Sequence, residues 1–272
     1  MKKILIPIDF TQASKNAVQF AMKLFPDANY DLIHVRTGMF NTAEPIGLGS
    51  GMTQEMFWKE TVEHFIKNEL DLNKIPKSIN IKIVVGGIVG EIIDYQKKEQ
   101  HDTVVMATKD KYGPFDRWFG TISLGVIKSS PVPVYLIPRY ARYSGFRRVI
   151  VGADSHLNDD KYLERIRDWN NRHTAFIKFI HIQEGLKDDF IEERRDLIEA
   201  LFENEDPNFA FEVEILKDND ISKSLLATAY NSKADLIIIS PEKDKLIKRV
   251  FLKSITREMI MKSNIPVLFL TA

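Results

Sequence analysis

The chain has 272 residues, of which 44% are apolar and 28% are charged, as in an ordinary globular protein of one or two domains. Lysine plus arginine and aspartate plus glutamate both number 38, so the chain has no basic excess to neutralise the phosphates of a nucleic acid. Cysteine is absent, which excludes disulfides, thiolate metal sites and cysteine nucleophiles.

The sequence also argues against a membrane partner. No apolar run approaches the roughly 18 residues of a membrane-spanning helix. The first residues carry two lysines and a short apolar stretch, as signal peptides do, but Pro7 and Asp9 interrupt that stretch and no small-residue cleavage site follows. We therefore expect a cytoplasmic protein that binds neither nucleic acid nor membrane.

In chain order, the first half alternates apolar runs with amphipathic stretches. The run 3–9 predicts a buried strand that ends at Asp9, and apolar residues at helical spacing between 17 and 25 predict a helix after it. The elements predicted next are a strand over 31–35, a helix over 57–70, a strand over 80–85, a helix over 90–100, a strand over 103–107, a further helix and a last strand over 133–137.

The second half repeats this order. Its first strand, 148–154, ends at Asp154, and the helix after it carries Tyr162, Ile166 and Trp169. The elements that follow are a strand over 179–182, a helix over 190–202, a strand over 211–216, a helix over 221–232, a strand over 236–240, a helix and a strand over 266–270. Duplication explains two halves with one element order, and we place the domains at residues 1–140 and 145–272.

Strands that are apolar throughout and alternate with helices predict parallel sheets covered on both faces. Because the crossovers between parallel strands are right-handed, each half is expected to be an α/β domain with an open, doubly wound sheet of five strands. The glycine-rich segment 37–52 has no counterpart in the second half. We interpret it as a surface loop; the alternative is that its GLGSG run cradles a phosphate, although the lysine of a Walker motif is missing.

Ligands of such sheets bind at the carboxyl ends of the strands, near the point where the strand order reverses. In the first half these ends carry Asp9, Val35 and the pair 106–107. The helix expected to open at 120–123 would present unpaired amides and the positive end of its dipole, which is enough to hold a phosphate.

At these residues the sequence resembles a known family. The run Ile-Pro-Ile-Asp at 6–9, the run Val-Val-Met-Ala-Thr-Lys at 104–109 and the later Gly120–Thr121 are similar to the universal stress protein family, and the element order agrees with it twice. The resemblance implies a fold of the adenine nucleotide alpha hydrolase type and a stress-response or regulatory role. It also implies an ATP or AMP site with magnesium, with adenosine near Pro7, Asp9, Val35 and Met106 and the phosphates near Ala107, Gly120, Thr121 and Ser123.

The motif of the family's ATP-binding members, Gly-x2-Gly-x9-Gly-Ser/Thr, is only partly kept. In the first half Ala107 and Asp110 replace its first two glycines, whereas Gly120 and Thr121 match. Asp110 is the more serious departure, because a carboxylate repels phosphate and a side chain prevents close approach of the backbone. The flanking lysines, or a magnesium ion, would offset this charge.

The second half has lost all three glycines of the motif. The corresponding positions are Ser240, Lys243 and Lys253, so we expect no nucleotide there. By the same resemblance, the halves are expected to pair as an intramolecular pseudo-dimer through their last strands, 133–137 and 266–270.

No catalytic constellation emerges from the sequence. No two of the six histidines have the spacing of a zinc site, and no serine lies in a nucleophile elbow. His34 and His181 occupy equivalent strand positions, which favours a packing or hydrogen-bonding role. We therefore expect that the protein is not an enzyme, with slow ATP hydrolysis as the one exception. Two alternatives stay open, a nucleotide-independent scaffold for an unknown protein partner and an enzyme of the wider alpha hydrolase class, whose phosphate-loop signature is missing.

Overall fold

The structure of the chain, a computed structural model, describes residues 1–37, 54–65, 79–108, 119–153, 160–183, 208–239, 258–259 and 262–270. Its internal contacts divide the chain into two units. Unit 1 comprises Met1–Val132 and Ile137–Arg142, and unit 2 comprises Pro133–Leu136 and Tyr143–Ala272. The glycine-rich segment from 38 onward and the helix expected over 190–202 lie outside the described residues.

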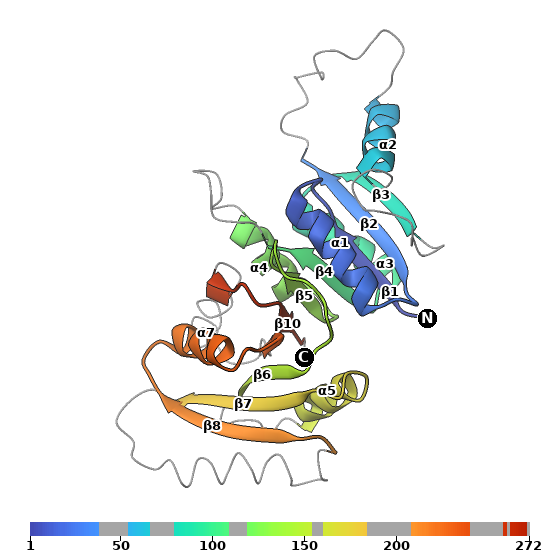
Figure 1. Cartoon of the computed structure of the whole chain (residues 1–272). Helices are drawn as coiled ribbons and strands as arrows, with labels where there is room; N and C mark the ends of the chain where they lie inside the picture. Colours follow the sequence, from blue (N-terminus) through green and yellow to red (C-terminus); the bar gives the residue numbers. More distant parts are fainter. Residues whose placement is uncertain are drawn as a thin grey trace. The chain divides into compact units, whose positions relative to one another are not determined.

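Unit 1 alternates strands and helices in the predicted order (Figure 1). Its elements are β1 (Lys3–Pro7), α1 (Gln12–Leu24), β2 (Asn29–Arg36), α2 (Gln54–His64), β3 (Ile79–Val85), α3 (Ile88–Glu99), β4 (Thr103–Ala107) and α4 (Phe119–Ser129). β1 is shorter than expected and ends before Asp9. α3 begins before Gly90, because Gly87 stands at its N-cap, and it ends where Gln100 takes a left-handed φ of 55°.

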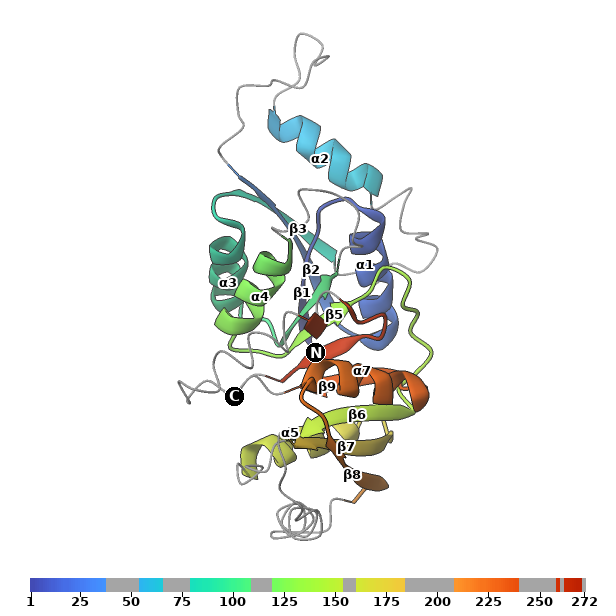
Figure 2. The same cartoon turned by 90° about the vertical axis from the view of Figure 1, so that its left-hand side faces the viewer.

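The strands of unit 1 form a parallel sheet in the order β3-β2-β1-β4. β1 is the strand at which the order reverses, since it pairs with β2 on one side and with β4 on the other, and Ile4 lies opposite both Tyr30 and Thr103. Figure 2 shows α1 on one side of these strands and α3 and α4 on the other. This arrangement confirms the doubly wound α/β fold, and it brings the carboxyl ends of β2, β1 and β4 to one edge.

The predicted apolar stripe of α1 is confirmed. Ala17, Phe20 and Leu24 are buried against the sheet, and the contribution to stability is about 1.5–3 kcal/mol for a large side chain such as Phe20. The helix begins after Thr11, whose hydroxyl accepts a hydrogen bond from the backbone N–H of Ser14 at 3.3 Å and so satisfies one unpaired amide.

A buried polar pair ties β2 to the turn between α3 and β4. Nε2 of His101 lies 2.7 Å from Oδ2 of Asp31, and the two residues are 2% and 4% exposed. The same carboxylate oxygen lies 3.6 Å from Nζ of Lys3 and accepts a hydrogen bond from the Tyr95 hydroxyl at 3.4 Å. Asp31 therefore depends on partners from β1, α3 and the segment before β4.

Unit 2 repeats the architecture of unit 1. Its elements are β6 (Arg148–Ala153), α5 (Asp160–Asn170), β7 (Phe176–Gln183), β8 (Phe211–Lys217), α7 (Ile221–Asn231), β9 (Leu236–Ile239) and β10 (Val267–Phe269), together with most of β5 (Val134–Ile137). The strand order β8-β7-β6-β9 matches β3-β2-β1-β4, and all these pairs are parallel. The described helices of the two units include none with the length and apolarity required to cross a membrane.

β5 is the antiparallel strand of the unit 2 sheet. It pairs with β10, so that Leu136 lies opposite Val267 and Val134 opposite Phe269. Tyr135 anchors it to α5, because its hydroxyl accepts a hydrogen bond from Nε1 of Trp169 at 2.8 Å. Burial raises the pKa of Tyr135. The last strand of the first repeat is thus part of the packing of unit 2.

We predict opposite effects of alanine at two helical glycines. A Cβ on Gly125 of α4 would lie 2.8 Å from a methyl group of Val89 on α3, so Gly125→Ala should lower the free energy of unfolding by about 1–3 kcal/mol. Gly90 has open space around it, and Gly90→Ala should raise that energy by up to about 1 kcal/mol. Urea denaturation followed by circular dichroism measures both. Val89→Ala combined with Gly125→Ala should recover part of the loss, and additive losses would contradict the close packing.

We also predict that the Asp31–His101 pair is strongly coupled. His101→Ala leaves the buried Asp31 carboxylate without its nearest partner, so the free energy of unfolding should fall by about 3–5 kcal/mol. In a double-mutant cycle with Asp31→Asn, the two losses should be far from additive. A loss below about 0.5 kcal/mol for His101→Ala would show that the pair does not hold β2 in place.

Candidate functional site

Four of the residues predicted to bind a ligand lie at the carboxyl edge of the unit 1 sheet. Pro7 ends β1, Val35 lies near the end of β2, and Met106 and Ala107 end β4. Met106 is 5% exposed, whereas the other three are partly exposed. Because β1 lies between β2 and β4, the structure brings these residues to the place where the strand order reverses.

Asp9 is held at this edge by a tight turn. Its Oδ1 accepts hydrogen bonds from the backbone N–H of Thr11 at 3.1 Å and from the Thr11 hydroxyl at 2.6 Å. Phe10, between them, has a φ of 62°, which is unusual for a bulky residue and indicates local strain. Since Thr11 also caps α1, this turn sets the position of both the Asp9 carboxylate and the start of the helix.

The structure describes the phosphate side of the predicted site only in part. Gly120 and Thr121 lie in the first turn of α4, and Ser123 is 6% exposed. Asp110 and its flanking lysines lie outside the described residues, as does the side chain of Thr121. In unit 2, β6 and β9 end at Ala153 and Ile239, and the positions expected to correspond to the motif are likewise outside the description.

An aromatic cluster beside Asp9 was missed in the sequence. Trp58 of α2 lies nearly parallel to two rings. Its centroid is 5.2 Å from that of His34, with an interplanar angle of 27°, and 6.1 Å from that of Phe10, with an angle of 24°. The centroids of Phe10 and His34 are 4.6 Å apart, and Phe65 meets Phe10 edge-on at 5.6 Å. Phe57 completes the aromatic cluster by packing edge-on against Trp58.

A sequence signal for part of this cluster exists. Trp58 and Phe65 are separated by two helical turns, a spacing that puts them on one face of a helix. Phe10, in contrast, could not be assigned to the cluster from its neighbours, because its left-handed backbone conformation decides where the ring points.

His34 has a histidine–carbonyl hydrogen bond that its counterpart in unit 2 shares. Nδ1 of His34 donates to the carbonyl of Ile8 at 2.9 Å, and Nδ1 of His181 donates to the carbonyl of Ala153 at 3.1 Å. This confirms the hydrogen-bonding role predicted for the pair. Burial lowers the pKa of His34, against the smaller opposing effects of its bond to Ile8 and the charge of Asp9. His34 is therefore a neutral ring at neutral pH.

The chemical features of this edge would suit a planar, polar molecule. The edge combines apolar strand ends, a fixed carboxylate and flat rings, and the guanidinium of Arg36 lies over the Trp58 ring at 5.2 Å. Within the described ranges, no group of three or more histidine, aspartate or glutamate side chains could hold a metal ion. No residue is therefore assigned to the magnesium that the family resemblance implies.

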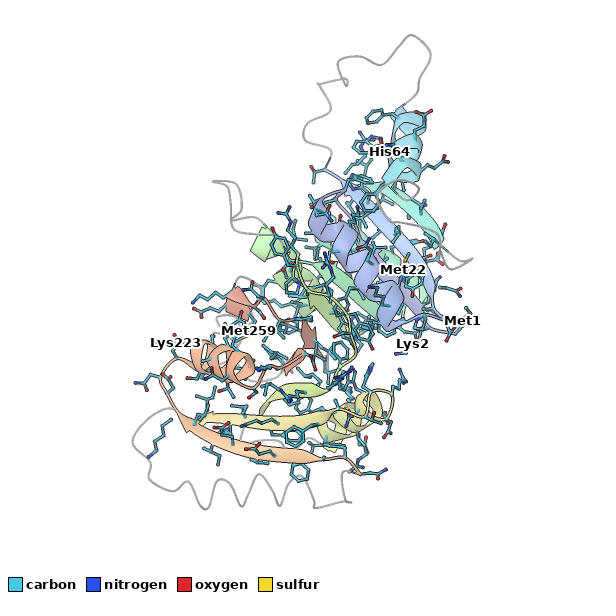
Figure 3. The ribbon with its side chains drawn as sticks, in the orientation of Figure 1. Met1, Lys2, Met22, His64, Lys223 and Met259 are labelled. Carbon is cyan, nitrogen blue, oxygen red and sulfur yellow. The ribbon has the colours of Figure 1, made fainter. Side chains whose placement is uncertain are left out.

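We predict that His34 makes unit 1 less stable in acid. Because the pKa of His34 is below its usual 6.5, the unfolded chain binds a proton that the folded chain resists, and stability should fall as the pH drops below about 6.5. His34→Gln should reduce the loss of urea resistance between about pH 7.5 and 5.5. His64, which is exposed on α2 (Figure 3), provides the control, since His64→Gln should leave that loss unchanged.

Comparison with known proteins gives one family. The family model described as the universal stress protein family matches residues 1–138. A comparison with curated protein sequences gives no significant match.

Solved structures agree over a longer part of the chain. A universal stress protein from Archaeoglobus fulgidus DSM 4304 is similar with a TM-score of 0.74 at 19% identity, over 99% of this chain and 96% of that chain. A functionally unknown protein from Pseudomonas aeruginosa PAO1 has a TM-score of 0.62 at 14% identity, over 100% of this chain and 92% of that one. A universal stress protein in complex with cAMP is 13% identical and covers 50% of this chain and 96% of its own, with a TM-score of 0.38.

At these identities the solved structures establish the shared fold alone, and the family assignment rests on the family model. That model spans half of the sequence, and the structure divides into two units of the same strand order. The chain therefore belongs to the universal stress protein family, as a member with two units in tandem.

Proposed function

We propose that the chain is a cytoplasmic stress-response or regulatory module whose unit 1 binds an adenine nucleotide, ATP or AMP. The observation that carries this proposal is the meeting of Pro7, Val35, Met106 and the Asp9 turn at the reversal point of the sheet. Open parallel sheets bind their ligands at this point. No catalytic role is proposed for any residue.

Each part of this edge suits one part of a nucleotide. Pro7 and Val35, which are partly exposed, would supply apolar surface for the flat faces of a base, with Met106 buried at the same edge. The Asp9 carboxylate would accept hydrogen bonds from ribose hydroxyls, and its bonds to Thr11 fix its orientation before the ligand arrives. The first turn of α4, with Gly120 and Thr121, would direct its backbone amides to a phosphate. A magnesium ion bound with ATP would supply positive charge beside the phosphates.

The tandem arrangement suggests a role for unit 2. Its motif positions lack glycine, so we propose that it binds no nucleotide and instead pairs with the first repeat as a pseudo-dimer. The antiparallel pairing of β5 with β10 supports this, because the last strand of one repeat joins the last strand of the other.

The second candidate function is a nucleotide-independent scaffold for a protein partner. The aromatic cluster favours it, since Trp58 already covers ring surface of Phe10 and His34 beside Asp9. The two replaced glycines, Ala107 and Asp110, point in the same direction. Nucleotide titration separates the two functions, because only the first requires saturable binding.

We predict saturable binding of AMP, or of ATP with magnesium, at one site per chain, measured by isothermal titration calorimetry. Asp9→Ala should weaken binding about tenfold or more, because it removes charged acceptor oxygens. Asp9→Asn keeps an oxygen that can accept the hydrogen bonds from Thr11 but removes the negative charge. Comparison of the two variants therefore separates the effect of the charge from that of the turn. Asp94→Ala removes an exposed carboxylate on α3 and should change nothing. No heat up to millimolar nucleotide would contradict the proposed function and favour the scaffold.

A further inference from the structure

We propose that Trp58 occupies the stacking surface of the nucleotide site, so that α2 must release it before a base can bind. This inference rests on the proposed function and concerns how that site is regulated. Its basis is the near-parallel contact of Trp58 with His34 and Phe10, next to the Asp9 carboxylate. A flat base that extends from Pro7 and Val35 onto the neighbouring rings of Phe10 and His34 would meet the same ring faces that the indole covers.

The geometry of the two strand-end rings shows why they form one surface. His34 is fixed by its hydrogen bond to the carbonyl of Ile8, and Phe10 is fixed by the Asp9–Thr11 turn. The centroids of the two rings are 4.6 Å apart. Both rings thus lie at the ends of β1 and β2 and are not part of α2. Trp58 of α2 and Phe65 just beyond α2 both contact these rings, but it is Trp58 that lies nearly parallel to them. Aromatic faces of this kind attract either an indole or a purine.

The described side chains of α2 include few that are buried. Among its described side chains Val62 is buried, and Phe65 just beyond its end is buried as well, whereas Phe57 and Trp58 are only partly buried. α1, by contrast, buries a whole face of its length. Elements with few buried apolar contacts open at low free-energy cost. In Figures 1 and 2, α2 lies beyond the ends of the strands opposite to the N-terminus, at the edge where a ligand would enter.

Displacement of this kind has a definite consequence for affinity. If a base and Trp58 compete for one surface, the observed affinity is reduced by the fraction of molecules in which Trp58 is released. The guanidinium of Arg36 lies over the indole at 5.2 Å, and this cation–π contact stabilises the arrangement in which Trp58 covers His34 and Phe10. If Trp58 blocks the base, removal of the indole should raise the affinity for the nucleotide. If the base instead stacks on Trp58, removal of the indole should lower that affinity.

The test is AMP titration of the full chain and three variants by calorimetry. Trp58→Ala should bind about tenfold more tightly than the wild type, and Trp58→Phe, which keeps a smaller ring, should lie between them. Glu60→Ala changes an exposed side chain on the same helix and should leave the affinity unchanged. Circular dichroism melting of each variant shows whether the fold is retained.

Hydrogen exchange gives an independent readout on the unmutated chain. AMP should raise the exchange of the backbone amides of Gln54–His64, because binding releases α2. Equal or weaker binding by Trp58→Ala, or slower exchange of α2 with AMP, would overturn the displacement while leaving nucleotide binding intact. Binding by Trp58→Ala without binding by the wild type would support a site that Trp58 covers, while contradicting the nucleotide binding proposed for the unmutated chain. No binding by any variant would overturn this inference and the proposed function together.

Discussion

β1 has a parallel partner on each side, and the rest of unit 1 depends on this position. Parallel strands cannot be joined by a tight turn, so the chain must cross over the sheet between them. Because these crossovers share one hand, the helices that lead away from β1 and back to β4 cover opposite faces, as α1 and α3 do (Figure 2). β6 has the same position between β7 and β9, and the same architecture follows in unit 2.

The two ends of the unit 1 sheet have become chemically different. At the amino end, Asp31 and His101 are buried together and their partners are all within the protein. At the carboxyl end, Asp9 is exposed in a turn with Phe10 in a left-handed conformation. Buried polar groups with fixed partners stabilise a fold, whereas residues in strained backbone conformations cluster at functional sites in proteins generally. The same residue types therefore stabilise one end and remain accessible at the other.

Histidine illustrates how the environment selects the role. His34 and His181 each donate to the carbonyl of the residue that ends, or directly follows, the neighbouring strand, and this bond orients the ring at the sheet edge. His101 faces a carboxylate instead and joins elements that are distant in sequence. A ring with one fixed nitrogen presents flat apolar faces, and this property of His34 allows Phe10 and Trp58 to pack against it.

The sequence by itself determined the alternation of strands and helices, the duplication and the edge at which Pro7, Val35 and Met106 meet, because apolar periodicity and the handedness of crossovers are local or general properties. It also predicted the shared role of His34 and His181. The roles of Asp9 and Gly120 toward a nucleotide stay predictions. The family resemblance implied that the last strands of the two repeats pair, and the structure added their antiparallel register. Only the tertiary structure decided that Trp58 covers His34 and that Gly125 of α4 lies against α3. Such contacts depend on the distance and angle between elements, which sequence spacing does not encode.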